Sequence, residues 1–199
     1  MSDVLEFLKA AIRNPLEVST VFPTSKSLAE TLLAHADLSR SKSVVELGAG
    51  TGAITKYLSP RLVYRDAYLG IELDPKMVDF LRAQKAYSGL RFETGLAENV
   101  LNWVQPSSVD VVVSSLPWTI FSTEMQASTI EAILQALKPG GVFVTYVCIN
   151  ATLYPNARGF INKLKSGFDD VYRSPVEWRN IPPAFIFKSS KGQNSKLVV

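Results

Sequence analysis

The sequence predicts an α/β fold with a mostly parallel sheet of seven strands, an antiparallel last strand and helices on both faces. Apolar segments with strand character alternate with helical patterns from residue 43 to residue 165, and this alternation is typical of a parallel sheet covered on both sides. The last two apolar segments, 171–178 and 184–188, are joined by a link that is too short for a crossover helix. We therefore expect them to pair antiparallel at the edge of the sheet.

Length and composition set the class of protein. The chain has 199 residues, of which 47% are hydrophobic and 20% charged, with a formal net charge of +3. We expect one globular domain over residues 1–199, located in the cytoplasm, because no apolar run is long enough to cross a bilayer and the N-terminus lacks a signal-peptide layout. The single cysteine, Cys148, excludes an internal disulfide. With one histidine we expect no metal site, and the mild basic charge gives no reason to expect nucleic acid.

Two helices are expected before the first strand. Residues 3–13 place their apolar side chains on one face, and this segment is either a helix packed on the core or a basic helix lying on a membrane surface. A second helix is expected over residues 25–36. We expect residues 1–40 to form a helical segment over the ligand site, and residues 190–199 to form a flexible tail.

Five strands and their helices follow in alternation. The central strands are apolar throughout, which indicates burial on both faces. The expected strands are residues 43–47, 67–73, 90–94, 109–113 and 142–149. The expected helices are residues 51–58, the segment after Pro75, residues 122–137 and residues 156–165.

The first strand ends in a glycine-rich turn. Glu46 is followed by Gly48, Gly50 and Gly52, and a helical pattern begins directly afterwards. Glycines permit a sharp turn and the close approach of a ligand, and a helix N-terminus offers free N–H groups. The spacing also fits a dinucleotide fingerprint, with Glu72 at a suitable distance for a ribose contact. Glu46 argues against that alternative, because its carboxylate would repel a pyrophosphate and would suit a cationic ligand.

Together these motifs resemble the class I S-adenosylmethionine-dependent methyltransferases, which have a Rossmann-like fold. Residues 44–52 match the family's first motif, Glu72 matches the acid that holds both ribose hydroxyls, and residues 95–98 occupy the adenine-binding position. The family often has aspartate where this chain has Leu96, so the contact to the adenine amine falls to Glu98 or to backbone. The resemblance implies S-adenosyl-L-methionine as the cofactor. The cofactor-binding residues that it implies are Thr24, Ser25, Glu46, Gly48, Ala49, Gly50, Glu72, Leu73, Leu96, Ala97, Glu98 and Ser114.

A proline-containing turn after the fourth strand indicates which kind of molecule accepts the methyl group. Residues 114–118, Ser-Ser-Leu-Pro-Trp, resemble the turns of methyltransferases that modify amines. In those enzymes a rigid turn aims backbone carbonyls and an aromatic face at the nitrogen, where they stabilise its developing positive charge. The resemblance implies Ser115, Leu116 and Trp118 as catalytic residues, with Trp118 facing the substrate. The alternative is that Trp118 only fills the core.

Two further segments indicate which group of methyltransferases the chain resembles. RNA adenine dimethylases share the Leu-Pro-aromatic turn, but they begin it with Asn, where this chain has Ser115, and they carry a helical domain after the sheet. Residues 22–25 and 177–185 resemble the bacterial phospholipid N-methyltransferases. That resemblance implies an ethanolamine headgroup as acceptor, peripheral contact with an anionic membrane at its inner face, and Arg179 as the ligand of the lipid phosphate. An ion pair or helix-end contact at the sheet edge is an equal alternative for Arg179.

Two other functions stay open at this point. One is methyl transfer to a soluble small-molecule amine, with the first helix acting as an ordinary lid. The other is a non-catalytic cofactor-binding module that keeps the glycine turn without the chemistry. The sequence does not determine the oligomeric state, the number of methyl groups transferred or the proton acceptor.

Overall fold

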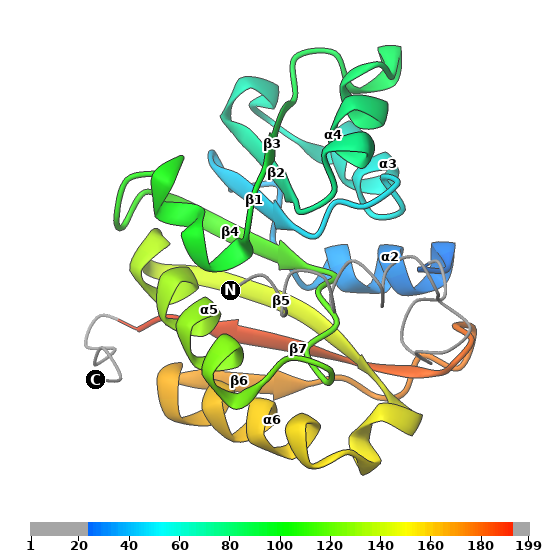
Figure 1. Ribbon diagram of the computed structural model, residues 1–199, viewed down its shortest axis with the longest axis vertical. Helices are drawn as coiled ribbons and strands as arrows, with labels where there is room; N and C mark the ends of the chain where they lie inside the picture. The colour runs from blue at the N-terminus through cyan, green and yellow to red at the C-terminus, as the bar shows by residue number, and fades with distance from the viewer. Residues whose placement is uncertain (1–23, 193–199) are drawn as a thin grey trace.

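The computed structural model describes residues 24–192 and contains one seven-stranded sheet (Figure 1). The strands are β1 (Val44–Leu47), β2 (Tyr68–Glu72), β3 (Arg91–Thr94), β4 (Val109–Ser114), β5 (Leu137–Cys148), β6 (Asp170–Arg173) and β7 (Ala184–Ser190). Their order across the sheet is β3-β2-β1-β4-β5-β7-β6. The chain moves outward in one direction from β1 and in the other from β4, so a crevice is expected where the carboxyl ends of β1 and β4 diverge.

The predicted antiparallel pair at the sheet edge is confirmed. The five strands from β3 across to β5 pair parallel with their neighbours in the sheet. β7 pairs antiparallel with β5 on one side and with β6 on the other. β6 is shorter than the predicted strand and ends at Arg173. Pro175 follows two residues later, and a proline has no N–H group to donate to a strand ladder. Residues 174–183 therefore form a long connection before β7.

Helices cover both faces of this sheet. The α-helices of the described part are α2 (Lys26–Ala34), α3 (Thr55–Leu58), α4 (Pro75–Arg82), α5 (Thr123–Ala136) and α6 (Pro155–Gly167). Short 3₁₀ turns include η4 (Ala97–Asn102) and η5 (Ile149–Leu153). Figure 1 shows α5 and α6 side by side over one face of the sheet, with α2 on the other. The expected helix at 3–13 and residues 193–199 of the expected tail lie outside the described residues.

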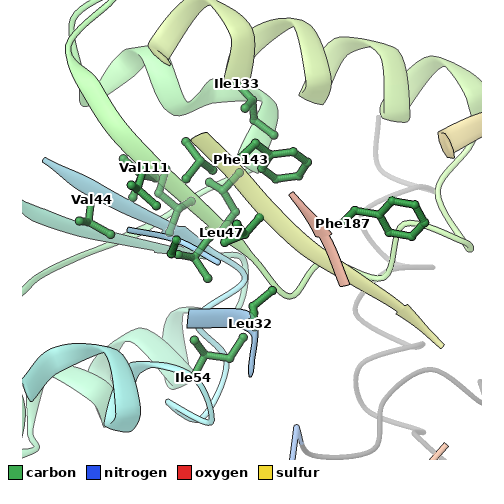
Figure 2. Close-up of a cluster of buried hydrophobic side chains, with 14 of the residues drawn as sticks. Leu32, Val44, Leu47, Ile54, Val111, Ile133, Phe143 and Phe187 are labelled. Carbon is green, nitrogen blue, oxygen red and sulfur yellow. The ribbon is translucent and has the colours of Figure 1, made fainter. Parts of the chain in front are cut away.

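One hydrophobic core holds the layers together (Figure 2). Ile133 from α5 packs with Phe143 from β5, and Leu32 from α2 lies with Ile54 under β1. All four side chains are at most 1% exposed, and burying a large apolar side chain stabilises a fold by about 1.5–3 kcal/mol. Within residues 24–192, no helix has the length and apolar character needed to cross a bilayer.

Candidate active site

A cavity of about 440 Å³ opens at the carboxyl ends of β1, β2, β4 and β5. This is the expected place for a ligand in an open α/β sheet. Most of the predicted cofactor residues line it. They are Thr24, Gly48, Ala49, Gly50, Glu72, Leu73, Leu96, Ala97 and Glu98. Ser115 and Leu116 from the predicted acceptor turn lie on the same wall.

The glycine turn forms the floor of this cavity. Gly48 and Gly50 have φ angles of +78° and +54°, in the left-handed region that residues with a Cβ rarely adopt. A Cβ added at Gly50 would meet nothing within 4 Å except the Gly48 carbonyl, so this position presents bare backbone to open space. A Cβ at Gly48 would approach the Leu116 side chain to 3.1 Å. The turn therefore has room for a ligand on one side and is packed against the acceptor turn on the other.

One hydrogen bond joins the two turns. The Ser115 hydroxyl donates to the Gly48 carbonyl over 2.6 Å. The backbone N–H of Ser115 also donates to the Leu47 carbonyl. The residues predicted to bind the cofactor and those predicted to meet the acceptor are thus held at a fixed separation across β1 and β4.

Glu72 lies at the end of β2 with its carboxylate on the cavity wall. One oxygen accepts the Gly50 N–H at 2.8 Å, and the other accepts the Leu73 and Asp74 N–H groups at 2.7 and 3.0 Å. A carboxylate has about four acceptor positions, so three backbone donors leave capacity for a further hydroxyl. This arrangement fits the predicted contact to a ribose. It also braces the glycine turn against β2.

An apolar slot continues from Glu72 along the wall. Leu73, Leu96 and Ala97 line it together with two methionines and a phenylalanine that sequence reasoning did not select, Met77, Met125 and Phe121. Such a surface suits a flat heterocycle. Glu98 also lines the cavity, and one of its carboxylate oxygens accepts a hydrogen bond from the Ser128 hydroxyl of α5. These side chains and the Gly50 backbone fit S-adenosylmethionine, whose adenine would lie in the slot and whose ribose would meet Glu72.

Glu46 does not line the cavity, and its predicted contact with a cationic ligand is wrong. The side chain is 0% exposed, and its carboxylate accepts hydrogen bonds from Tyr68 at 2.6 Å and from Thr55 at 3.0 and 3.1 Å. Burial raises the pKa of Glu46 to about 7, although the hydrogen bonds from Tyr68 and Thr55 act to lower it. Glu46 therefore anchors the start of α3 and β2 beneath the turn.

Trp118 likewise lies in the core, so the prediction that it faces the substrate is wrong. Its ring is 1% exposed and stacks on Phe160 of α6 at a centroid distance of 4.5 Å. The indole N–H donates to the hydroxyls of Ser114 and Thr145 at 3.2 and 3.1 Å. Ser114 is 0% exposed and lies behind the wall. The stacking partner and the hydroxyl acceptors satisfy both the apolar and the polar parts of the indole.

Ser25 and Arg179 also lie off the cavity wall. Ser25 caps α2, because its hydroxyl accepts the Leu28 N–H at 3.2 Å, and its own N–H donates to the Asn180 side chain at 3.0 Å. Arg179 is exposed in the 174–183 connection, and its N–H donates to the Glu177 carboxylate at 3.0 Å. Thr24, which precedes Ser25, does line the cavity wall.

Tyr146 is a site residue that sequence reasoning missed. It projects from β5 into the cavity, and its hydroxyl lies 3.1 Å from the Thr24 hydroxyl. Burial raises the pKa of Tyr146, so the phenol stays protonated at neutral pH and can orient an acceptor by hydrogen bonding. Its polar hydroxyl near the carboxyl end of a mostly apolar strand was the available signal.

The chain is similar to known methyltransferases along most of its length. Residues 44–141 match a model described as a methyltransferase domain. An ornithine lipid N-methyltransferase from Singulisphaera acidiphila is 28% identical over 92% of this chain and 94% of its own length. An rRNA adenine N-6-methyltransferase from Bacillus licheniformis is 32% identical over 51% of this chain, and the match spans 34% of that relative.

Solved structures show the same fold. The N-methyltransferase NodS from Bradyrhizobium japonicum superposes with a TM-score of 0.67 at 15% identity, covering 87% of this chain and 99% of that one. A 16S rRNA methyltransferase from T. thermophilus, solved with AdoMet and guanosine, gives a TM-score of 0.61 at 19% identity, covering 88% of this chain and 42% of that one. With the glycine turn, Glu72 and the antiparallel β7, these findings identify the chain as a class I S-adenosylmethionine-dependent methyltransferase.

Proposed function

We propose that this methyltransferase acts on the amine of a membrane lipid, with the ethanolamine headgroup of a phospholipid as the first candidate. The observation that carries the proposal is the fixed pairing of the glycine turn with the Ser115–Leu116 turn through the 2.6 Å hydrogen bond from Ser115 to Gly48. We take the Ser115–Leu116 turn, whose sequence resembles the turns of amine methyltransferases, as the acceptor turn beside the cofactor floor. The full-length similarity to an ornithine lipid N-methyltransferase supports a lipid amine.

The protein's part in the reaction is to bind the cofactor and the acceptor, to orient them toward each other and to exclude water. S-adenosylmethionine supplies an activated methyl group when it is bound. Glu72 and the apolar slot would hold it, as their fit to ribose and adenine indicates. Backbone carbonyls of Ser115 and Leu116 would orient the amine and stabilise its developing positive charge. The paired hydroxyls of Thr24 and Tyr146 lie on the same cavity wall and would hold the polar part of the acceptor.

RNA is the second candidate acceptor. The 32% identity to an rRNA adenine N-6-methyltransferase and the shared Leu-Pro-aromatic turn favour it. Trp118 is stacked on Phe160 within the core, so it presents no face to a base, and an amine at this turn would likewise meet backbone carbonyls without the indole. An aromatic stacking platform is the usual means of holding an unpaired base.

Transfer of labelled methyl groups from S-adenosylmethionine separates these candidates. The acceptors are vesicles containing phosphatidylethanolamine, vesicles containing an ornithine lipid, free ethanolamine and unmodified ribosomal RNA. We expect label in the extracted lipid, first with phosphatidylethanolamine. Label in the ornithine lipid alone would keep the lipid-amine class and change the headgroup. Label only in free ethanolamine or only in RNA would overturn the proposal, as would cofactor binding with no transfer to any acceptor.

A further inference from the structure

Two neighbouring connections expose an unusual group of apolar side chains. Of the eight large apolar side chains that are exposed among the described residues, four lie here. They are Leu153 (80% exposed), Tyr154 (51%), Trp178 (71%) and Ile181 (76%). The first two lie between β5 and α6, and the other two lie between β6 and β7. Single exposed apolar residues are ordinary on a protein surface, but a group of this kind marks an interaction site.

These connections lie at the end of the sheet at which the cavity opens (Figure 1). Figure 1 shows both at the same end of the sheet, where β5 ends and β7 begins. The Ile149 N–H donates to the Pro183 carbonyl at 2.8 Å, which joins the two connections directly. The Asn180 side chain accepts the Ser25 N–H at 3.0 Å, one residue from Thr24 of the cavity wall. The connections that carry the apolar side chains are therefore linked by hydrogen bonds to the segment next to Thr24 of the cavity wall.

Basic side chains accompany the apolar ones. Arg179 lies between Trp178 and Ile181, and Arg158 lies in the first turn of α6, and both are exposed. The acidic Glu177 of the same connection is directed to the protein, because its carboxylate accepts hydrogen bonds from Thr31 at 3.0 Å and from the Arg179 N–H at 3.0 Å. Exposed apolar side chains and aromatic rings insert into the interface of a bilayer, and flanking arginines bind its anionic headgroups. This group of side chains therefore suits an anionic bilayer surface.

We propose that Leu153, Tyr154, Trp178 and Ile181 form a membrane-docking surface, which Arg158 and Arg179 orient toward anionic headgroups. The partner that this surface binds is a phospholipid bilayer. Docking in this way places the acceptor end of the cavity at the headgroup layer, so that a lipid amine reaches it without leaving the membrane. This inference rests on the proposed lipid acceptor, because a soluble substrate would gain nothing from such an approach.

Vesicle flotation with the full chain tests the surface. The vesicles contain phosphatidylethanolamine with or without phosphatidylglycerol. The apolar variant carries Trp178→Ser with Leu153→Ser, and the matched control carries Val63→Ser with Tyr64→Ser. The control residues are 54% and 49% exposed and precede β2, so they lie at the opposite end of the sheet. We expect the apolar variant to bind anionic vesicles about tenfold or more weakly than the unaltered chain, and the control to bind normally.

A charge variant and an activity measurement complete the test. Arg179→Gln should reduce binding to anionic vesicles about fivefold and leave binding to neutral vesicles little changed. Methylation of a short-chain phosphatidylethanolamine dispersed below its micellar concentration should be equal in the apolar variant and the unaltered chain. Normal vesicle binding by the apolar variant, or equal loss in the control, overturns the docking surface. Absence of lipid methylation by the unaltered chain instead refutes the proposed function, whatever the flotation shows.

Discussion

Among the described residues, Glu46 is the only one whose carboxyl pKa is strongly raised. Replacing it by glutamine removes this ionisable group and changes the shape of the side chain little. Burial raises the pKa of this side chain to about 7 from an ordinary value of 4.5. Its oxygens receive hydrogen bonds from Tyr68 and Thr55, and a glutamine keeps one oxygen to accept such a bond. The substitution therefore removes the titration and keeps most of the packing.

The sign of the effect follows from the direction of the shift. Between about pH 4.5 and about pH 7 the folded protein holds a proton on Glu46 that the unfolded chain has released. The contribution of Glu46 to the free energy of unfolding is thus largest at the acidic end and falls as the pH rises through this window. A shift from 4.5 to about 7 corresponds to a loss on the order of 3 kcal/mol, complete above about pH 7.

Denaturant unfolding from about pH 5 to about pH 8 measures this contribution. The quantity of interest is the free energy of unfolding of Glu46→Gln minus that of the unaltered protein, because the other titrating groups cancel in the difference. We expect it to rise by about 2–3 kcal/mol across the range. Glu93→Gln is the control, since this carboxylate is partly exposed beside Arg82 and Arg91. A difference that stays flat with pH, or that rises equally in the control, would refute the reasoning.

Three further substitutions test the site. Glu72→Gln should weaken S-adenosylmethionine binding by about 1–3 kcal/mol in calorimetry, because it disturbs three backbone hydrogen bonds and the ribose contact; unchanged affinity would contradict the placement of the cofactor. Trp118→Phe should lower the free energy of unfolding by about 1–3 kcal/mol and leave KM for the acceptor unchanged, because two buried hydroxyls lose their indole donor; an altered KM at normal stability would return Trp118 to the substrate site. Tyr146→Phe should lower kcat/KM for the acceptor about tenfold with unchanged cofactor affinity, since only the hydroxyl beside Thr24 is lost; equal kcat/KM would remove Tyr146 from the site.

That most of the predicted cofactor residues line one cavity was largely predictable, because the determinants of their positions are local. Gly48 and Gly50 lie in a turn whose conformation depends on those residues themselves, and Glu72 ends a strand whose direction the alternation of elements sets. Parallel strands bring their carboxyl ends together, so a residue after β1 and a residue after β2 must lie near each other. Leu96 and Ala97 follow β3 by the same rule and reach the same cavity.

The orientation of Glu46 and Trp118 was not predictable in this way. Each follows from partners that lie far away in the sequence. The indole of Trp118 is held by Phe160 of α6 and Thr145 of β5, and a sequence pattern does not show which face of a proline turn those elements cover. The charge of Glu46 and its place in the first motif predict a contact with the ligand, whereas Tyr68 of β2 supplies a hydrogen bond that allows the carboxyl group to be buried. Side chains whose role depends on long-range packing need the fold before they can be interpreted.

The same distinction explains why the cofactor is better determined than the acceptor. The acceptor end of the cavity combines Thr24, Ser115 and Tyr146, which come from three segments separated by tens of residues. The glycine turn supports this end through the hydrogen bond from Ser115 to Gly48, so any acceptor bound there is positioned relative to the cofactor by a contact within the protein. Specificity must then come from what can enter beside Thr24 and Tyr146. Under the docking surface proposed above, the exposed apolar side chains and arginines of the neighbouring connections would bring that substrate from a membrane.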